Sequence, residues 1–250
     1  MKDFVDRFPL DWAASRGLNT FLSVTHGTDE PAKFLEIHYK AAPQKDAQPV
    51  AFVGKGITFD SGGISLKPGE NMKLMRGDMG GAGAVVSATL AIAKLKLPVN
   101  IVTVAPLTEN MPGPSATKPG DIIYAMNGKS VEVDNTDAEG RLTSDELWER
   151  LNVAGEHEFD RFWRMPLNED YGTCSSGGRP AGSATAALFL KAFAHGIETE
   201  DGSNAATAMK WAHLDIAGAK NSTRPLPYQE IGMTGRPTRA LIEYVRGLGN

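Results

Sequence analysis

The feature that most limits the possible folds is an apolar segment, a helix of small residues and a second apolar segment in direct succession. Val50–Gly54 (VAFVG) is short and continuously apolar, as in a buried strand of a parallel sheet. Ala82–Leu95 is rich in Ala, Val and Leu and predicts a buried helix, and Val99–Leu107 predicts the next strand. Strand, helix and strand in this order form a βαβ unit, which predicts an α/β fold.

The remaining chain adds shorter elements to this unit. Phe34–Tyr39 alternates apolar and polar residues, as a half-buried strand does. Asn127-Gly128 is a strong two-residue turn signal between Asp121–Tyr124 and Ser130–Asp134, so a hairpin is predicted there. We further expect a short amphipathic helix or arm over Phe4–Trp12, a helix over Gly182–Ala194, a strand over Trp211–Ile216, and a helix over Arg236–Arg246.

Composition excludes several classes of protein. A net charge of −4 provides no basic surface for nucleic acid. One cysteine, Cys174, forbids an internal disulfide and fits a reducing compartment. Met1–Leu10 carries charges and has no apolar core, so we do not expect a signal peptide there, and no apolar run reaches membrane-spanning length. We therefore expect a cytoplasmic protein of one domain over its 250 residues.

Four carboxylates lie in polar stretches beside the predicted strands. Asp60 lies in the glycine-rich loop Gly54–Gly63, Asp78 precedes the predicted Ala82–Leu95 helix, and Asp137 and Glu139 share one stretch. Carboxylates that are brought together repel one another unless cations lie between them. Two divalent ions roughly 3.5–4 Å apart are a known arrangement for hydrolysis.

Each stretch also has a simpler explanation when it is taken alone. Gly54–Gly63 can be a glycine-rich turn with a solvated Lys55 and Asp60. The helix dipole favours an acid such as Asp78 at a helix N-terminus. The stretch with Asp137 and Glu139 can be a polar turn. The five histidines are scattered and no H-E-x-x-H sequence occurs, so a histidine-based zinc site is not expected.

The three stretches GKGITFDSGG, MRGDMGG and NTDAEGR together resemble the signatures of the leucine aminopeptidase family, the cytosol aminopeptidases. The resemblance begins near Phe21 and includes ENMP, KPGD, WRMPL, WAHLDIAG and GMTGRPT. It implies the fold of that family's C-terminal catalytic domain, a mixed, largely parallel sheet flanked by helices and phosphorylase/hydrolase-like. It also implies hydrolysis of peptides that have a free N-terminus, leucine-type, by homo-oligomers that are hexamers in the family.

The resemblance further implies a role for each site residue. It gives two groups of metal ligands, one of Asp60, Asp137 and Glu139 and the other of Lys55, Asp60, Asp78 and Glu139. The metals would be zinc, manganese or magnesium. Lys67 corresponds to the lysine that supports the substrate carbonyl. Arg141 corresponds to the arginine that holds a bicarbonate-like anion.

The chain departs from the family's pattern in three places. The family has an N-terminal domain ahead of the catalytic one, and we expect that domain to be absent here. After Leu142 a helix and a strand, on the order of forty residues, are missing. Thr143 and Glu146 form a T-x-x-E capping box, which predicts a helix directly after this junction. A second, smaller gap lies near Tyr171–Arg179.

These departures leave two alternatives to a working aminopeptidase. One is a structural or regulatory relative, a truncated or splice form that keeps the metal ligands and is catalytically impaired. The other is a di-metal phosphoesterase, which fits the carboxylates but not NTDAEGR. The shortening also puts hexamer formation in question.

Overall fold

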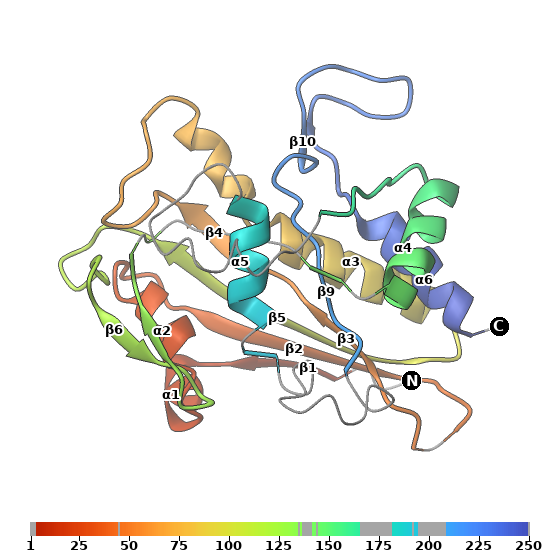
Figure 1. Cartoon of the computed structure of the whole chain (residues 1–250), viewed down its shortest axis with the longest axis horizontal. Coiled ribbons are helices and arrows are strands. Elements are labelled where there is room, and N and C mark those ends of the chain that lie inside the picture. Colours follow the sequence, from red (N-terminus) through yellow and green to blue (C-terminus); the bar gives the residue numbers. More distant parts are fainter. Residues whose placement is uncertain are drawn as a thin grey trace.

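A mixed β-sheet forms the centre of the fold (Figure 1). The computed structural model describes residues 4–44, 46–134, 136, 142–143, 145–165, 182–191, 193–194 and 209–249. The main sheet contains β1 (Phe4–Phe8), β2 (Lys33–Lys40), β3 (Val50–Val53), β4 (Gly56–Asp60) and β5 (Asn100–Asn110). Its order is β1-β2-β5-β3, and β4 also pairs with β5. The β1–β2 and β2–β5 pairs are antiparallel, whereas β3 and β4 run parallel to β5.

The predicted βαβ unit is confirmed. β3 pairs with β5 in a register that runs from Val50↔Ile101 to Val53↔Val104, and α3 (Gly80–Leu95) connects the two strands. The hydroxyl of Thr89 on α3 lies 2.6 Å from that of Thr103 on β5, and both side chains are buried. This hydrogen bond satisfies two polar groups inside the contact between helix and sheet.

Helices cover both faces of the sheet, as an α/β fold requires. α3 contacts α6 (Thr238–Leu248), which also contacts α4 (Asp145–His157) (Figure 1). Among the described residues, the core between α3, α6 and the sheet contains nine buried side chains: Tyr39, Phe52, Val85, Ala88, Ile92, Val99, Ile101, Leu241 and Val245.

The opposite face of the sheet packs against α1 (Leu10–Ser15) and α2 (Asn19–Thr25). Trp12 and Phe21 contact Phe34, with ring centroids 5.4 and 6.0 Å from it. Phe34 and Tyr39 are an odd number of positions apart on β2, so they point to opposite faces. Because Tyr39 belongs to the core with α3, Phe34 and its two partners lie on the other side.

Shorter elements complete the described chain. They are η1 (Met72–Gly77), β6 (Ile122–Tyr124), β7 (Ser130–Glu132), β8 (Leu142–Thr143), α5 (Gly182–Lys191), β9 (Ala212–His213), β10 (Asn221–Ser222) and β11 (Gly232–Met233). β6 and β7 form the predicted hairpin around Asn127-Gly128. Among the described helices, none is long and apolar enough to cross a membrane.

Two expectations near the strands were wrong in part. Phe4–Phe8 is a strand, because pairing with β2 satisfies its backbone, and the helix begins only at Leu10. Half of the predicted loop Gly54–Gly63 is strand β4, because the eleven-residue β5 is long enough to pair with β3 and β4 in turn.

Two predicted strands also differ from expectation in burial or length. Val50–Val53 is not buried on both faces: Phe52 faces the core, whereas Val53 is 72% exposed. Within the predicted Trp211–Ile216 strand, only Ala212–His213 pairs, and its partner is β8. The helix predicted after the junction follows at Asp145, with Thr143 in β8.

Candidate functional site

Asp60 ends β4 and lies almost completely inside the protein. It is 3% exposed. Its Oδ1 accepts hydrogen bonds from the Gly62 N–H at 2.8 Å and from Asn110 Nδ2 at 2.9 Å. Its Oδ2 lies 3.3 Å from Lys67 Nζ. The turn after Asp60 therefore brings a backbone donor, an amide and an ammonium group to one buried carboxylate.

The pKa of Asp60 lies below its ordinary value. Burial acts in the opposite direction, because a charged carboxylate loses solvation. The Gly62 N–H, the positive charges of Lys67 and Lys55, and the Asn110 amide together outweigh this penalty. Asp60 is therefore an ionised carboxylate near neutral pH, as a metal ligand must be.

Asp78 forms a second buried carboxylate at the start of α3. It is 9% exposed and lies between η1 and the helix. Lys55 Nζ is 2.9 Å from its Oδ2, and Lys220 Nζ is 3.2 Å from its Oδ1. Two lysines from distant parts of the sequence thus contact one carboxylate.

Glycines allow the helix to approach the strand closely enough for these contacts. The Ala82 N–H donates to the Lys55 carbonyl at 2.8 Å. A Cβ atom on Gly54 would lie 2.6 Å from Val85 Cγ2 and 2.7 Å from Ala82 Cα, which no real side chain allows. Glycine at position 54 therefore holds the N-terminus of α3, and with it Asp78, against Lys55.

Lys55 links the surroundings of the two carboxylates. Lys55 pairs with Asp78, and its charge also acts on Asp60. Asn110 donates both to Asp60 Oδ1 and, at 3.0 Å, to the Thr136 carbonyl. The residue that immediately precedes Asp137 is therefore anchored beside Asp60.

The other predicted site residues, Asp137, Glu139 and Arg141, lie outside the described residues. Within the described part of the chain, no group of three or more His, Cys, Asp or Glu side chains could hold a metal. The donors that are described, two buried carboxylates and a lysine amine, fit a hard or borderline divalent cation. The described surroundings of Lys55, Asp60 and Asp78 are therefore compatible with the predicted metal-binding role of these three residues.

Sequence reasoning missed two residues that contact the carboxylates. Asn110 belongs to the ENMP segment, which contributes to the family resemblance but predicts no role for this residue. Lys220 follows WAHLDIAG by two positions and carries no signal at all. Contact between positions 142 residues apart depends on tertiary structure, and a pattern within the sequence does not reveal it.

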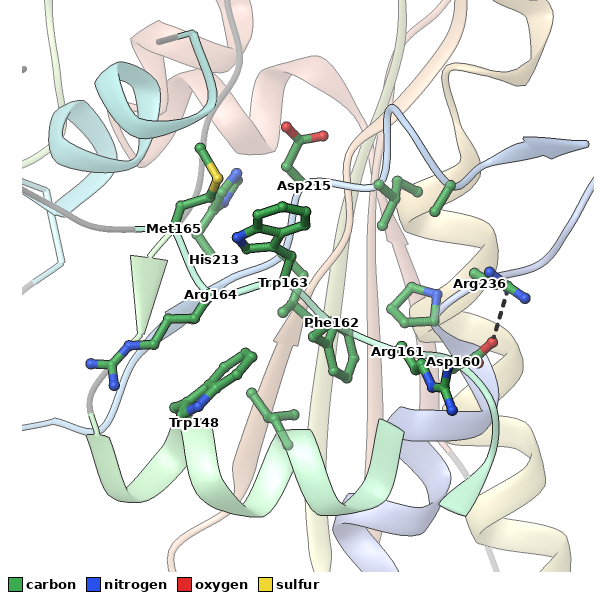
Figure 2. A pocket seen from close by; sticks show the side chains of 15 residues that line it. Trp148, Asp160, Arg161, Phe162, Trp163, Arg164, Met165, His213, Asp215 and Arg236 are labelled. Carbon is green, nitrogen blue, oxygen red and sulfur yellow. Dashed lines mark ion pairs between the residues drawn. The ribbon is translucent and has the colours of Figure 1, made fainter. Parts of the chain in front are cut away.

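A cavity of about 160 Å³ is lined by residues of the segment that precedes Lys220 and by residues after α4. Figure 2 shows Trp148, Phe162 and Trp163 gathered around it, with Asp160 and Arg236 paired at one end. The Asp160 Oδ1 and Arg236 Nε atoms are 3.3 Å apart. Residues 213–216 and 219 line its other wall, so the segment that carries Lys220 links the cavity to Asp78.

Comparison with known proteins extends the resemblance to nearly the whole chain. The sequence profile of the cytosol aminopeptidase family, catalytic domain, matches residues 5–144 and 143–242. The chain is 44% identical to human cytosol aminopeptidase over 288 aligned positions, which cover 95% of the chain and 53% of the relative. It is 42% identical to the Dictyostelium discoideum cytosol aminopeptidase, with 98% of the chain and 56% of the relative covered. The chain thus spans about half the length of these relatives.

The alignment also locates an interruption. Since 95% of 250 residues is about 238, about 50 of the 288 positions aligned with the human protein have no counterpart here. The two matched segments of the family profile meet at residues 143–144, where the sequence predicted a missing helix and strand.

A solved structure agrees in fold. The bottromycin maturation enzyme BotP in complex with Mn has a TM-score of 0.85 and 30% sequence identity. The match covers 99% of this chain and 63% of that one. The family profile, the relatives and the fold all lead to one conclusion: this chain belongs to the cytosol aminopeptidase family and matches the model of that family's catalytic domain.

Proposed function

We propose that the protein is a two-metal aminopeptidase that hydrolyses the first peptide bond of substrates with a free N-terminus, with a preference for leucine-type residues. The observation that carries this proposal is the pair of buried carboxylates, Asp60 and Asp78, which share Lys55 as a neighbour. Burying charges is costly, and proteins do so where paired charges serve a site.

Three of the five predicted metal ligands, Lys55, Asp60 and Asp78, are among the described residues, whereas Asp137 and Glu139 are not. Asp60, Asp137 and Glu139 would hold one metal, and Lys55, Asp60, Asp78 and Glu139 the other. Lys55 can donate a lone pair only as a neutral amine, which two nearby dications favour. When bound, the metals supply Lewis-acid chemistry and an activated water.

The residues around the metals position the substrate. Lys67 already lies against Asp60, and its ammonium group can support the carbonyl oxygen as negative charge develops on it. Arg141 would hold a bicarbonate-like anion beside the attacking water through its planar guanidinium. We also propose a cytoplasmic location and a homo-oligomer, the hexamer of the family, for a single catalytic domain.

Metal-dependent hydrolysis of leucine amide by the purified chain tests this function directly. The protein is stripped with a chelator and assayed after addition of Mn²⁺, Zn²⁺ or Mg²⁺. N-acetyl-leucine amide is the matched control, because it lacks the free amino group that the site requires. Release of ammonia from leucine amide alone, and only with metal, supports the proposal. Equal cleavage of both compounds, or cleavage without metal, would contradict it.

A substitution of Asp137 tests the ligand assignment. Asp137→Ala should reduce the bound metal from about two ions to about one per chain, since Asp137 is predicted to serve only one site. Elemental analysis of dialysed protein measures the ratio. The control is Asp134→Ala, which removes an exposed carboxylate three positions earlier and should leave the metal content unchanged. The same metal content in both variants would refute the assignment of Asp137.

A further inference from the structure

Lys220 is a cation that the predicted ligand set does not use. Its Nζ lies 3.2 Å from Asp78 Oδ1, and its side chain is only 13% exposed. The neighbouring Lys55 side chain is 39% exposed and approaches the other oxygen of Asp78. Lys220 is therefore the more deeply buried of the two ammonium groups at this carboxylate.

The surrounding backbone holds Lys220 in this place. The Lys220 N–H donates to the Ile216 carbonyl at 2.7 Å, and the Lys220 carbonyl accepts from the Thr234 N–H at 2.8 Å. The Thr234 hydroxyl also donates to the Ala219 carbonyl at 2.6 Å. A lysine whose backbone is fixed on both sides loses less conformational entropy when it forms an ion pair.

We propose that Lys220 is a resident counter-cation of Asp78, which stabilises the metal-free site and competes with the metal ion for the Asp78 carboxylate. This inference rests on the proposed function, because it takes Asp78 as a metal ligand. Removing a partner from a buried ion pair is destabilising. Lys220, together with the more exposed Lys55, therefore offsets the cost of burying the Asp78 charge when no metal is bound.

The competition follows from charge and space. A divalent cation held by the Asp78 carboxylate would lie within several ångströms of the Lys220 ammonium, and like charges at that distance repel in a poorly solvated site. Metal binding would therefore be weakened unless the Lys220 head group moves away from Asp78. Lys55 differs, because its nitrogen is predicted to become a ligand of the same metal and so does not have to leave.

Replacing Lys220 should reveal both its stabilisation of the metal-free protein and its competition with the metal ion. Lys220→Met keeps an unbranched side chain that is one atom shorter and removes its charge. We expect this variant to bind Mn²⁺ more tightly by on the order of tenfold. Its metal-free form should unfold at a lower temperature than the metal-free wild type, and saturation with Mn²⁺ should close most of that gap. Lys220→Arg, which keeps the charge, should show no gain in affinity.

Calorimetric titration of the metal-stripped chain with Mn²⁺, together with thermal unfolding with and without Mn²⁺, measures both quantities without an activity assay. Lys118→Met is the matched control. Lys118 Nζ donates at 3.3 Å to the Ala116 carbonyl, so this variant loses one positive charge away from Asp78. Lys220→Gln provides a second neutral variant in case the methionine disturbs folding.

The outcomes distinguish this inference from the proposed function. The role of Lys220 is overturned if the folded neutral variants bind Mn²⁺ no more tightly than the wild type does. The proposed function still stands in that case, because the wild type binds Mn²⁺. An equal loss of thermal stability with and without Mn²⁺ also overturns the role of Lys220, because that result describes a purely structural lysine. If the wild-type chain binds neither Mn²⁺ nor Zn²⁺, the proposed function fails and the competition fails with it.

Discussion

At the scale of single residues, Asp60 depends on partners from three separate parts of the sequence. Gly62 lies two positions after it, Lys67 lies seven positions after it, and Asn110 comes from the end of β5. These partners stabilise the ionised form, so the pKa of Asp60 is lower in the folded chain than in the unfolded one. The stability that Asp60 contributes must therefore depend on pH.

The sign of this dependence can be predicted. A carboxylate with a lowered folded pKa contributes stability that is present above its unfolded pKa, about 3.9, and lost as pH falls through the folded value. Asp60→Asn should therefore destabilise the metal-free chain by about 1–3 kcal/mol at pH 6. The difference from wild type should shrink below about pH 4.

Urea unfolding of the metal-free protein between pH 3 and pH 7 measures this difference. Asp134→Asn, which changes an exposed carboxylate, serves as the control and should follow the wild type throughout. A constant gap between Asp60→Asn and wild type over the whole range would show that ionisation of Asp60 does not contribute.

Much of the candidate site could be predicted from local sequence, but its geometry could not. The stretches GKGITFDSGG and MRGDMGG contain Lys55, Asp60 and Asp78, but each stretch alone also allows a simpler explanation. Their combination, and the family resemblance that it carries, is what predicts a metal-binding role for these residues. Lys220 could not be found in this way, because its contact with Asp78 depends on where the chain returns after β9.

At the scale of elements, the contact between the β3–β4 junction and the start of α3 positions the site. The sequence predicted β3, α3 and β5 because apolar runs and a helix of small residues are strong local signals. The sequence did not predict the strands β1 and β4, because strand pairing is decided by partners distant in sequence. It also did not indicate which glycine forms the close contact.

Substitution of glycines in this region should have very different effects. Gly54→Ala places a Cβ atom 2.7 Å from the Gly81 carbonyl and pushes α3 away from Lys55. We expect a loss of about 1–3 kcal/mol of stability, and weaker metal binding because the Lys55–Asp78 contact opens. Gly69→Ala, where no atom lies within 4 Å of the added Cβ, should change stability by less than about 0.5 kcal/mol.

Chemical denaturation and Mn²⁺ titration of the two variants provide the comparison. Equal behaviour of Gly54→Ala and Gly69→Ala would mean that the helix accommodates the extra atom, and the close approach would then not matter for the site.

At the scale of the whole molecule, the junction at residues 142–143 separates the predicted metal ligands from the rest of the chain. Every predicted ligand precedes the junction, whereas α4, α5, α6 and Lys220 follow it. About 50 positions of the human relative have no counterpart in this chain. We therefore expect a chain that binds metal but turns over substrate slowly, because a displacement of about 1 Å can reduce a rate about a hundredfold.

Restoring the missing segment tests this expectation. The unmatched segment of human cytosol aminopeptidase, inserted between Leu142 and Thr143, should raise both the unfolding midpoint and the hydrolysis of leucine amide. A Gly/Ser linker of equal length at the same position is the control and should give neither gain. If the chain without an insertion already matches the human enzyme, the segment is dispensable.

The exposed position of β3 has a consequence for the behaviour of the protein in solution. Among the described strands, only β5 pairs with β3, and Val53 on β3 is 72% exposed. A strand with a free edge and an apolar surface is a template for pairing with another polypeptide. Self-association should therefore increase with protein concentration, and a charged residue at position 53 should suppress the larger species in analytical ultracentrifugation.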